Sequence, residues 1–382
     1  AKALHAHRFH SLVRLLPLSD DVRPLAPVRV RETDDYRAVK DQESLRKLEA
    51  TVCGSENCAL DTESDDKDPR KASLLGVAFS VRKGSAWFVP LLERDLNGVS
   101  RDEVIASLQR ILTKQRRIVG HNIKYDALLL RRHGVTIRSS YFDTMLAAYD
   151  CFGNWDFFNL GFLAEKLLGK RIKRYSDIVR KDQTFLDLPF RELMGHGCQD
   201  ADFALRLHEQ LDEELRRRKI RDQYSNTTMK LAQRLARYEF QGVHVDLNTL
   251  DKLRNGLLDR MTVVKERIWG RFGNKMDLDS PKELTAAVKD HLNLPGAIGV
   301  KSFSVRLLEE LAIQHRDVRH IVEYKRMRKQ LRRIESIAAA AQESRVYPLF
   351  NQVRSPSGRL SSSDPSLFEE DSVGLIKRAF GT

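Results

Sequence analysis

Apolar and polar residues follow two different patterns along the chain, and the change falls near residue 217. Before that point, β-rich apolar runs occupy residues 73–81 and 85–89, on either side of Arg82-Lys83-Gly84. This pattern predicts a hairpin. Helix, strand and helix patterns then alternate through residue 150. Antiparallel strands followed by such an alternation predict an α/β domain with a mixed sheet.

Several further elements are predicted in this first part. Residues 41–48 have the pattern of a short helix, which leads to an apolar run that ends in Ala59-Leu60-Asp61-Thr62-Glu63. Residues 117–120 predict a short strand, followed by a helix that stops at Gly134. We expect residues 151–190 to be helical. A later helical stripe consists of Leu193, Gly197, Ala201, Ala204, His208, Leu211 and Leu215.

The pattern after residue 217 is different, because strand signals nearly vanish and long, basic amphipathic helices dominate. Gly242-Val243-His244-Val245-Asp246 predicts a helix stop. Ser280-Pro281-Lys282-Glu283 combines a capping box with proline at the first helical position, which predicts a helix start. We therefore expect a tail or linker at residues 1–30, an α/β domain at residues 31–217 and a mainly α-helical region at residues 218–382.

The charge balance restricts the class of partner. The 382 residues include 66 Lys and Arg against 53 Asp and Glu, which gives a net charge of +13. The isoelectric point is about 9.6. Such an excess favours an anionic partner, and nucleic acid is the commonest one. The chain has no run of eighteen apolar residues, so we expect no membrane-spanning helix.

The cysteines and the N-terminal composition bear on the compartment. The four cysteines lack a C-x-x-C pair and a matching histidine spacing, which predicts reduced intracellular thiols rather than a zinc site or a disulfide framework. The first nineteen residues contain three Lys or Arg, three His and no acid. This composition is typical of an organelle transit remnant, and a trimmed linker is an equal alternative.

Two carboxylates two residues apart end the apolar run before residue 64. In a β-strand, Asp61 and Glu63 project from the same face, while Leu60 and Thr62 face the other way. Adjacent anions repel each other, and hard divalent cations such as Mg²⁺ or Mn²⁺ neutralise them best. Taken alone, the pair is more typical of exposed acids at a strand end.

Two other places put polar groups beside apolar faces. Asn122 and Asp126 are four residues apart in Gly120-His121-Asn122-Ile123-Lys124-Tyr125-Asp126, on one face of a first helical turn. Asp200 lies at the edge of the later helical stripe, and His196 precedes it by one turn. These side chains are candidates for one common site with the acids of the D-x-E pair.

Together the three places resemble the motifs of the DEDD superfamily of 3′–5′ exonucleases: D-x-E, N-x-x-x-D, and an aromatic residue or His followed by D. Their order, context and spacing are similar to those of the proofreading domain of family A DNA polymerases, the bacterial polymerase I type. This resemblance implies an RNase H-like fold for residues 31–217. The family has tyrosine in Y-x-x-x-D-A-D where this chain has His196. The superfamily's His-bearing branch places its histidine five residues before the acid, so His196 matches neither branch.

The resemblance implies two divalent ions, Mg²⁺ or Mn²⁺. Asp61, Glu63 and Asp200 would hold the ion that binds the attacking water. Asp61 and Asp126 would hold the ion that stabilises the leaving 3′ oxygen. His196 would orient or deprotonate the water.

Contacts to nucleic acid are expected in both parts of the chain. Phe185 falls where the family has a Thr-Phe pair near the path of the single strand, so it would stack on a base or else pack in the core. Between residues 316 and 333, eight Lys and Arg outnumber two acids. This excess favours a thumb helix that follows phosphates over a solvated face. In this basic stretch we expect Lys325, Arg328, Lys329 and Arg332 to contact nucleic acid. In the second motif we expect the same of Asn122.

Residues 350–365 resemble a further family block. Ser357-Gly358-Arg359-Leu360-Ser361-Ser362 is similar to T-G-R-L-S-S at the thumb-to-palm junction of family A polymerases. The resemblance implies that Arg359, with Ser361 nearby, reaches the duplex minor groove near the primer end. Residues 377–380 correspond to the entry of the palm, so we expect a thumb and the start of a palm, without fingers or a catalytic palm.

We therefore expect a 3′–5′ exonuclease that hydrolyses DNA phosphodiester bonds as the proofreading part of a family A DNA polymerase in replication and repair. Its partners would be single-stranded 3′ ends and primer–template duplex, with no membrane, and it would be a monomer. It would lie in the cytoplasm, at the nucleoid, of a bacterium, or in a mitochondrion or plastid.

Three alternatives stay open. An RNase D-like RNA exonuclease shares the acids but lacks the block at residues 357–362. A non-catalytic DNA- or partner-binding module could derive from such a polymerase, although the intact acids argue against it. The third alternative is a complete polymerase of which this sequence lacks the palm.

Overall fold

The computed structural model divides the chain into two compact units. The first contains residues up to Phe240 together with Phe350–Ser361, and the second contains Gln241–Leu349 and the residues from Ser362 on. The tail expected at residues 1–30 lies outside the described residues. The described residues are 35–96, 98–173, 175–180, 183–273, 275–292, 302–355, 357–368 and 376–380.

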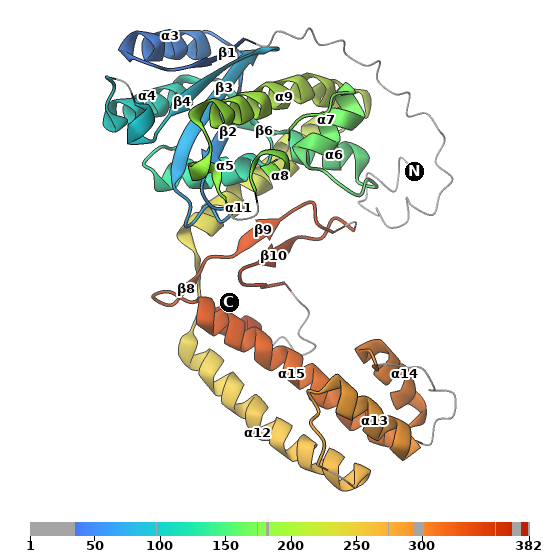
Figure 1. Cartoon of the computed structure of the whole chain (residues 1–382). Coiled ribbons are helices and arrows are strands. Elements are labelled where there is room, and N and C mark those ends of the chain that lie inside the picture. Colours follow the sequence, from blue (N-terminus) through green and yellow to red (C-terminus); the bar gives the residue numbers. More distant parts are fainter. Residues whose placement is uncertain are drawn as a thin grey trace. The chain divides into compact units, whose positions relative to one another are not determined.

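The first unit is built on a six-stranded sheet (Figure 1). Its strands, in spatial order, are β1 (Asp35–Ala38), β4 (Ser85–Pro90), β3 (Leu74–Arg82), β2 (Asn57–Ser64), β5 (Arg117–Gly120) and β6 (Ser140–Asp143). β2, β3 and β4 pair antiparallel, whereas β1, β5 and β6 join in parallel. The mixed sheet and the hairpin are as predicted. β1 is not predicted by the sequence, because four residues are too few to establish an alternation.

Helices connect and cover these strands. Those of the first unit are α3 (Gln42–Cys53), α4 (Arg101–Lys114), α5 (Ile123–Arg132), α6 (Thr144–Phe152), α7 (Leu160–Leu168), α8 (Tyr175–Ile178), α9 (Phe190–Arg217), α10 (Arg221–Gln223) and α11 (Met229–Gln241). The expectation of helix throughout residues 151–190 is wrong, since between α6 and α9 the described residues of this range form only α7, α8 and a short 3₁₀ turn at Phe185–Asp187. Gly169 adopts a left-handed conformation at φ 63° and ends α7.

The two faces of the sheet carry different helices. On one face, Leu60 of β2 packs in a core with residues of α3, α4 and α5, including Leu48 and Leu108. On the other face, neighbouring Ala59 packs in a core with residues of α6, α7 and α9. Figure 1 shows α9 lying across the sheet. Because strand residues alternate between faces, Asp61 and Glu63 leave β2 on the side of α9.

The first unit extends beyond the boundary that the sequence predicts at residue 217. After α9, the chain continues through α10 and a π-helical turn (Tyr224–Thr228) into α11. The buried side chains of Tyr224, Met229 and Ala232 belong to the same core as α6 and α9. The division at Phe240 therefore follows packing, which the local change of pattern does not detect.

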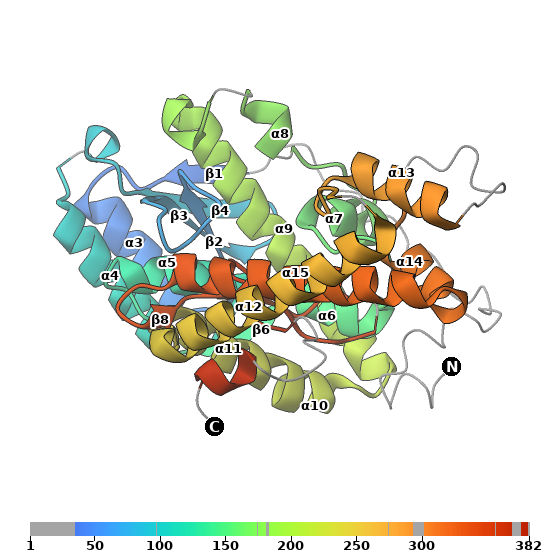
Figure 2. The same cartoon turned by 90° about the horizontal axis from the view of Figure 1, so that it is seen from below.

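The second unit is mainly helical, as predicted. Its elements are α12 (Leu247–Phe272), α13 (Pro281–Leu292), α14 (Val305–Gln314), α15 (Arg316–Ala340), β7 (Val243–His244), β8 (Arg345–Val346) and a 3₁₀ turn at Ile376–Phe380. β9 (Leu349–Asn351) and β10 (Ser361–Ser363) lie where the chain passes between the units. Figures 1 and 2 both show α12 and α15 side by side, with a core that includes Val264, Ile268, Ile321 and Ile334.

Helix α13 begins at Pro281 as predicted, although its cap differs in detail. The backbone N–H of Glu283 donates to Ser280 Oγ at 3.4 Å. The carboxylate of Glu283 accepts instead from the backbone N–H of Asp277, at 2.8 Å. Glu283 thus stabilises the turn before the helix and does not close the reciprocal half of the capping box.

Candidate active site

The end of β2 presents Asp61 and Glu63 to helix α9. Gly197 of α9 makes room for this approach, since a Cβ atom there would lie 3.1 Å from Glu63 Oε1 and 3.2 Å from Glu63 Cγ. Glycine therefore lets the helix pass close to the carboxylate, whereas a larger residue would push Glu63 or Phe88 by a few tenths of an ångström. The predicted projection of the two acids to one face therefore agrees with the packing of their neighbours Ala59 and Leu60.

Asp126 reaches the same strand from α5. Its Oδ1 accepts hydrogen bonds from the backbone N–H of Thr62, at 3.1 Å, and from Thr62 Oγ1, at 2.6 Å. These bonds fix a buried carboxylate beside the strand that carries Asp61 and Glu63. The first two motifs are thus adjacent through a direct contact.

The start of α5 is held by Asp143, a residue outside the three sequence motifs. Its carboxylate accepts from the backbone N–H groups of Asn122, at 3.2 Å, and Ile123, at 3.0 Å. It also accepts from Met145 and Leu146 at the start of α6. An acid that ends a short apolar run just before a helix is the sequence signal that could have identified this cap.

Asn122 occupies the N-cap of α5, as predicted, in a left-handed conformation at φ 63°. Its side chain makes no capping hydrogen bond. The carboxylate of Asp143 performs that task instead. The amide of Asn122 therefore has no role in holding the helix start.

The third motif lies on α9. His196 Nδ1 is 2.8 Å from Glu63 Oε1, and His196 Nε2 is 4.0 Å from Asp200 Oδ2. The imidazole thus lies between an acid of β2 and an acid of its own helix. β2, α5 and α9 together bring the four predicted acids and His196 into one neighbourhood.

Burial raises the pKa values of the three aspartates. The pKa of Asp61 lies well above its usual value because of burial and the charges of the other three acids. Burial raises the pKa of Asp126 to about 7, against the opposing effect of the hydrogen bonds from Thr62. Burial also raises the pKa of Asp200 to about 6, although the charge of His196 acts to lower it. The site therefore disfavours four simultaneous negative charges unless a cation offsets them.

The positive charge of His196 offsets part of the negative charge of the acids. Burial lowers the pKa of His196, but the hydrogen bond to Glu63 and the charges of Asp200 and Glu63 outweigh burial and raise the pKa to about 9. Without a metal ion, the imidazole is therefore positively charged at neutral pH. The expected role as a neutral base requires additional positive charge nearby to lower this pKa.

The donor set suits a hard divalent cation by its chemistry, because it offers several buried carboxylates that repel one another. The side chains do not form a ready coordination shell. Among the described residues, no group of three or more His, Cys, Asp or Glu is arranged so that it could hold a metal ion. Asp126 is engaged by Thr62, and Glu63 by His196. Metal binding would therefore require these side chains to rearrange.

The second acid of Asp200-Ala201-Asp202 has a structural role. Asp202 is fully buried and accepts from Arg206 Nη2 at 2.6 Å. It also accepts from the Tyr36 hydroxyl and the Gly84 backbone N–H. These bonds tie α9 to β1 and the β3–β4 turn, away from the acidic site.

Phe185 is buried rather than open to a base. Its side chain is only 7% exposed. Its ring lies 5.1 Å from the ring of His196 and 4.8 Å from that of Tyr175, measured between centroids. The placement beside the acidic site agrees with the expected position, while the burial matches the core-packing alternative.

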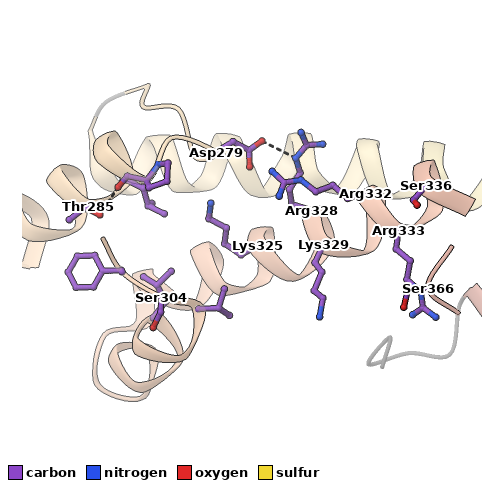
Figure 3. A pocket seen from close by; sticks show the side chains of 15 residues that line it. Asp279, Thr285, Ser304, Lys325, Arg328, Lys329, Arg332, Arg333, Ser336 and Ser366 are labelled. Atoms are coloured by element: carbon purple, nitrogen blue, oxygen red, sulfur yellow. Dashed lines mark hydrogen bonds and ion pairs between the residues drawn. The ribbon is translucent and has the colours of Figure 1, made fainter. Parts of the chain in front are cut away.

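The predicted basic contacts of α15 lie together in the second unit. Figure 3 shows them lining a cavity of about 590 Å³ beside Asp279, Thr285 and Ser304. Lys325 Nζ donates to the carbonyl of Leu278 at 2.6 Å, and Arg328 pairs with Asp279 at 2.9 Å. The four predicted cations in this cavity are Lys325, Arg328, Lys329 and Arg332.

Arg359 and Ser361 belong to the segment that returns to the first unit. The side chain of Arg359 is exposed, and it follows Gly358, whose φ of 73° requires a glycine-compatible backbone. Ser361 Oγ lies 3.5 Å from the carbonyl oxygen of Asn351. This segment is anchored to the unit by Phe350, whose backbone N–H donates to Glu239 at 2.6 Å.

The mixed sheet and the clustered acids define a class of nuclease domain, and comparison with known families agrees. Residues 36–216 match the 3′–5′ exonuclease family, and residues 247–370 match DNA polymerase family A. The chain therefore belongs to the family A DNA polymerases, with a 3′–5′ exonuclease domain in its first part. This confirms the resemblance inferred from the motifs.

Individual relatives support the same assignment. DNA polymerase I of Pseudomonas aeruginosa is 30% identical over 355 residues, which cover 87% of this chain and 38% of the relative. DNA polymerase I of Borreliella burgdorferi is 24% identical over 372 residues, which cover 94% of this chain and 40% of the relative. The chain thus spans about two fifths of the length of these relatives.

A solved structure shares the fold. The POL domain of Pol1 from M. smegmatis, in complex with DNA primer-template and dNTP, matches 90% of this chain with a TM-score of 0.70 and 22% identity. The match covers 58% of that chain. No helix in the described part of the present chain is long and apolar enough to cross a membrane.

Proposed function

We propose that the chain hydrolyses DNA phosphodiester bonds from the 3′ end in a metal-dependent reaction, as the proofreading part of a family A DNA polymerase. The observation that carries this proposal is the convergence of acids from β2, α5 and α9 on one place. Burial and mutual repulsion raise the pKa of Asp61, so a bound divalent cation would offset the repulsion among the acids. The match of residues 247–370 to DNA polymerase family A favours this proposal over the RNase D-like alternative.

The four acids would hold the divalent cations. Bound Mg²⁺ or Mn²⁺ would supply the positive charge that stabilises the attacking and leaving oxygens of a phosphodiester. Thr62 keeps Asp126 at the strand, and Asp143 keeps the start of α5 in place. Gly197 leaves the space in which Glu63 lies. The protein thus supplies oxygen ligands from three packed elements, whose side chains would rearrange on metal binding, and needs no covalent intermediate.

His196 would orient the attacking water, in the position of the family's tyrosine. Its Nδ1 is occupied by Glu63, so Nε2, on the side of Asp200, is the atom suited to face the water. In this role His196 would be neutral, which requires its pKa to lie below the value of about 9 that Glu63 and Asp200 produce, and positive charge held by the acids would have that effect.

The cations of α15 and the exposed Arg359 would contact DNA phosphates and the primer–template duplex. Lys325 and Arg328 already have protein partners, so they would mainly shape the cavity. Arg332 lies in the same cavity and is the strongest candidate for a phosphate contact.

A second candidate function is a non-catalytic DNA- or partner-binding module. The hydrogen bond between His196 and Glu63 favours it, because a charged imidazole offsets the acids without any metal ion. Such a module would bind DNA without degrading it.

The test uses single-stranded DNA labelled at its 5′ end, incubated with the purified chain and Mg²⁺, Mn²⁺ or EDTA. The proposed function predicts a ladder that shortens one nucleotide at a time from the 3′ end, with no reaction in EDTA. An otherwise identical RNA strand distinguishes the RNA exonuclease. Binding without shortening under every metal condition would support the non-catalytic module.

A further inference from the structure

Lys124 belongs to the second motif but points away from the acids. It precedes Asp126 by two residues in the first turn of α5, and side chains two positions apart on a helix point in directions roughly 200° apart. The carboxylate of Asp126 accepts from Thr62 of β2. The ammonium group of Lys124 pairs instead with the carboxylate of Glu239, on α11.

This ion pair is buried. The side chain of Lys124 is 14% exposed and that of Glu239 is 1% exposed. Removing two charges from water is costly, and apolar residues of similar size often stabilise a fold equally well or better. Stability therefore gives little reason for an ion pair at this place. The buried and paired ammonium group is also poorly placed to reach a phosphate of DNA.

Glu239 has a second partner. The same atom, Oε1, also accepts from the backbone N–H of Phe350, at 2.6 Å. Lys124 lies in the range that matches the exonuclease family and Phe350 in the range that matches DNA polymerase family A, while Glu239 lies between the two ranges. All three residues are in the first unit. Figure 1 labels their elements, α5, α11 and β9.

Other contacts hold the two elements that Glu239 connects. The guanidinium group of Arg131, near the end of α5, lies 3.9 Å from the centre of the Phe240 ring. The Tyr149 hydroxyl of α6 donates to the carbonyl of Ser355 at 2.8 Å. Helix α5 is thus held against α11 near both of its ends, and the segment Phe350–Ser361 is held against α6.

We propose that Lys124 is a positioning residue for the exonuclease reaction, which holds the first turn of α5, and with it Asp126, through Glu239. Thr62 holds the carboxylate of Asp126 from the side of β2, and the ion pair holds the helix from the side of α11. Because Glu239 also binds Phe350, the place of Asp126 depends on the segment Phe350–Ser361. The inference rests on the proposed exonuclease function.

The first test removes the cation. Lys124→Met should lower kcat for single-stranded DNA about tenfold with little change in KM, because a small misplacement of a reacting group slows the reaction while the contacts to the strand remain. Lys124→Arg should retain most of the kcat, since it keeps a cation within reach of Glu239. The matched control is Arg110→Met, which breaks the ion pair between Arg110 of α4 and Glu49 of α3 and should keep the wild-type kcat.

A double variant separates position from stability. Lys124→Met alone leaves Glu239 as a buried anion without its cation, so its Tm should fall. Lys124→Met with Glu239→Gln buries no such anion, so its Tm should recover toward that of the wild type. Its kcat should stay low, because two neutral side chains do not hold the helix as the ion pair does. Recovery of kcat together with Tm would mean that Lys124 has a structural role alone.

The same variants test whether Lys124 binds the strand. In that case Lys124→Met would raise KM and Glu239→Gln would not, which would overturn the positioning role. The positioning role predicts that both variants lower kcat and leave KM near the wild-type value.

Hydrogen exchange tests the link to Phe350 without any substrate. In Lys124→Met, the amides of residues 122–127 and of residues 350–353 should exchange faster, because Glu239 loses the partner that holds its carboxylate in place. The amides of α4 should keep their wild-type rates. Faster exchange in residues 122–127 alone would overturn the link. If the wild type does not shorten DNA, the proposed function fails, and hydrogen exchange still decides whether α5 and Phe350 are linked.

Discussion

At the scale of single residues, the negative charges of the acids in the candidate site are partly balanced by the positive charge of His196. The raised pKa values of the aspartates and of His196 have one common origin, because buried acids are unfavourable as anions and favour any nearby cation. His196 supplies one positive charge between Glu63 and Asp200. A tyrosine in the same place would stay neutral. The residue that departs from the family pattern thus changes the electrostatics of the site without a metal ion.

The first prediction concerns His196 and stability in EDTA. A folded pKa of about 9 against an ordinary 6.5 means that the stabilisation is fully present below pH 6.5 and is lost as pH rises through 9. His196→Ala should therefore be less stable than wild type at pH 6.5, by on the order of 3 kcal/mol. The difference in free energy of unfolding between His196→Ala and wild type should be smaller at pH 9.5. Urea unfolding at the two pH values measures it, and a gap independent of pH would mean that His196 only packs.

The second prediction concerns metal ions and the aspartates. Acids with raised pKa values bind protons more tightly in the folded state, so without metal the stability falls as pH rises from about 4 to about 7. The pKa values of Asp126 and Asp200, about 7 and about 6, place both as anions at pH 8 and mainly neutral at pH 5. Mn²⁺ should therefore raise the Tm by roughly 2–5 °C at pH 8 and by much less at pH 5.

Thermal unfolding with Mn²⁺ or EDTA at both pH values measures this difference. The control is Asp61→Asn with Asp126→Asn, in which the shift at pH 8 should disappear. An equal shift in the control, or at pH 5, would place the bound metal elsewhere.

At the scale of elements, the site depends on how β2, α5 and α9 meet. Gly197 and Gly195 lie on the same helix but differ in their surroundings. A Cβ at Gly197 would lie within 3.2 Å of Glu63 and of Phe88, whereas a Cβ at Gly195 would meet nothing within 4 Å. The tight packing of α9 on Glu63 therefore lies at Gly197 and not at Gly195.

The third prediction uses this matched pair. Gly197→Ala should displace Glu63 and lower kcat for single-stranded DNA at least tenfold, because metal ligands tolerate little misplacement. Gly195→Ala should retain activity and change the free energy of unfolding by no more than about 1 kcal/mol. Activity assays and circular dichroism of both variants test it. Similar kcat values for the two variants would show that Glu63 needs no such space.

Some helices and strands could be predicted from the sequence pattern, and others could not. The hairpin was predictable because two β-rich apolar runs flank a polar turn, and the buried stripe of α9 was predictable because it has a helical period. The short strand β1 and the cap formed by Asp143 were not, since a four-residue strand has no period and a cap depends on which helix lies nearby. The helix expected at residues 151–190 failed because Gly169 ends α7 there. The burial of Phe185 depends on tertiary packing, which a local motif cannot reveal.

At the scale of the whole molecule, an acidic site in the first unit and a basic cavity in the second share one chain with a net charge of +13. The acids would act on the phosphodiester and the cations would hold the strand. The acids were predicted from their motifs and the cations from the excess of basic residues, and the structure places each group together. It placed the division between the units at residue 217 rather than at Phe240, because the packing of Tyr224 and Met229 on the first unit is not encoded by local composition.

The fourth prediction concerns the basic cavity. Arg332→Ala should weaken binding of primer–template DNA several-fold and reduce the slope of log affinity against log salt by about 0.9, as expected for one lost phosphate contact. Arg254→Ala is the control, since this arginine of α12 lies outside the cavity and pairs with Asp251. Fluorescence anisotropy at several salt concentrations measures the slopes. Equal slopes for both variants and the wild type would remove Arg332 from the DNA contact.

The most direct measurement is the rate at which the chain shortens 5′-labelled single-stranded DNA in Mn²⁺, compared between wild type and Asp61→Ala with Asp126→Ala. The control variant Asp102→Asn changes an exposed acid of α4. Because the carboxylates act as a unit, the double variant should be slower by about a hundredfold or more, while the control keeps the wild-type rate. A double variant that degrades DNA as fast as wild type would contradict the assignment of the acidic site.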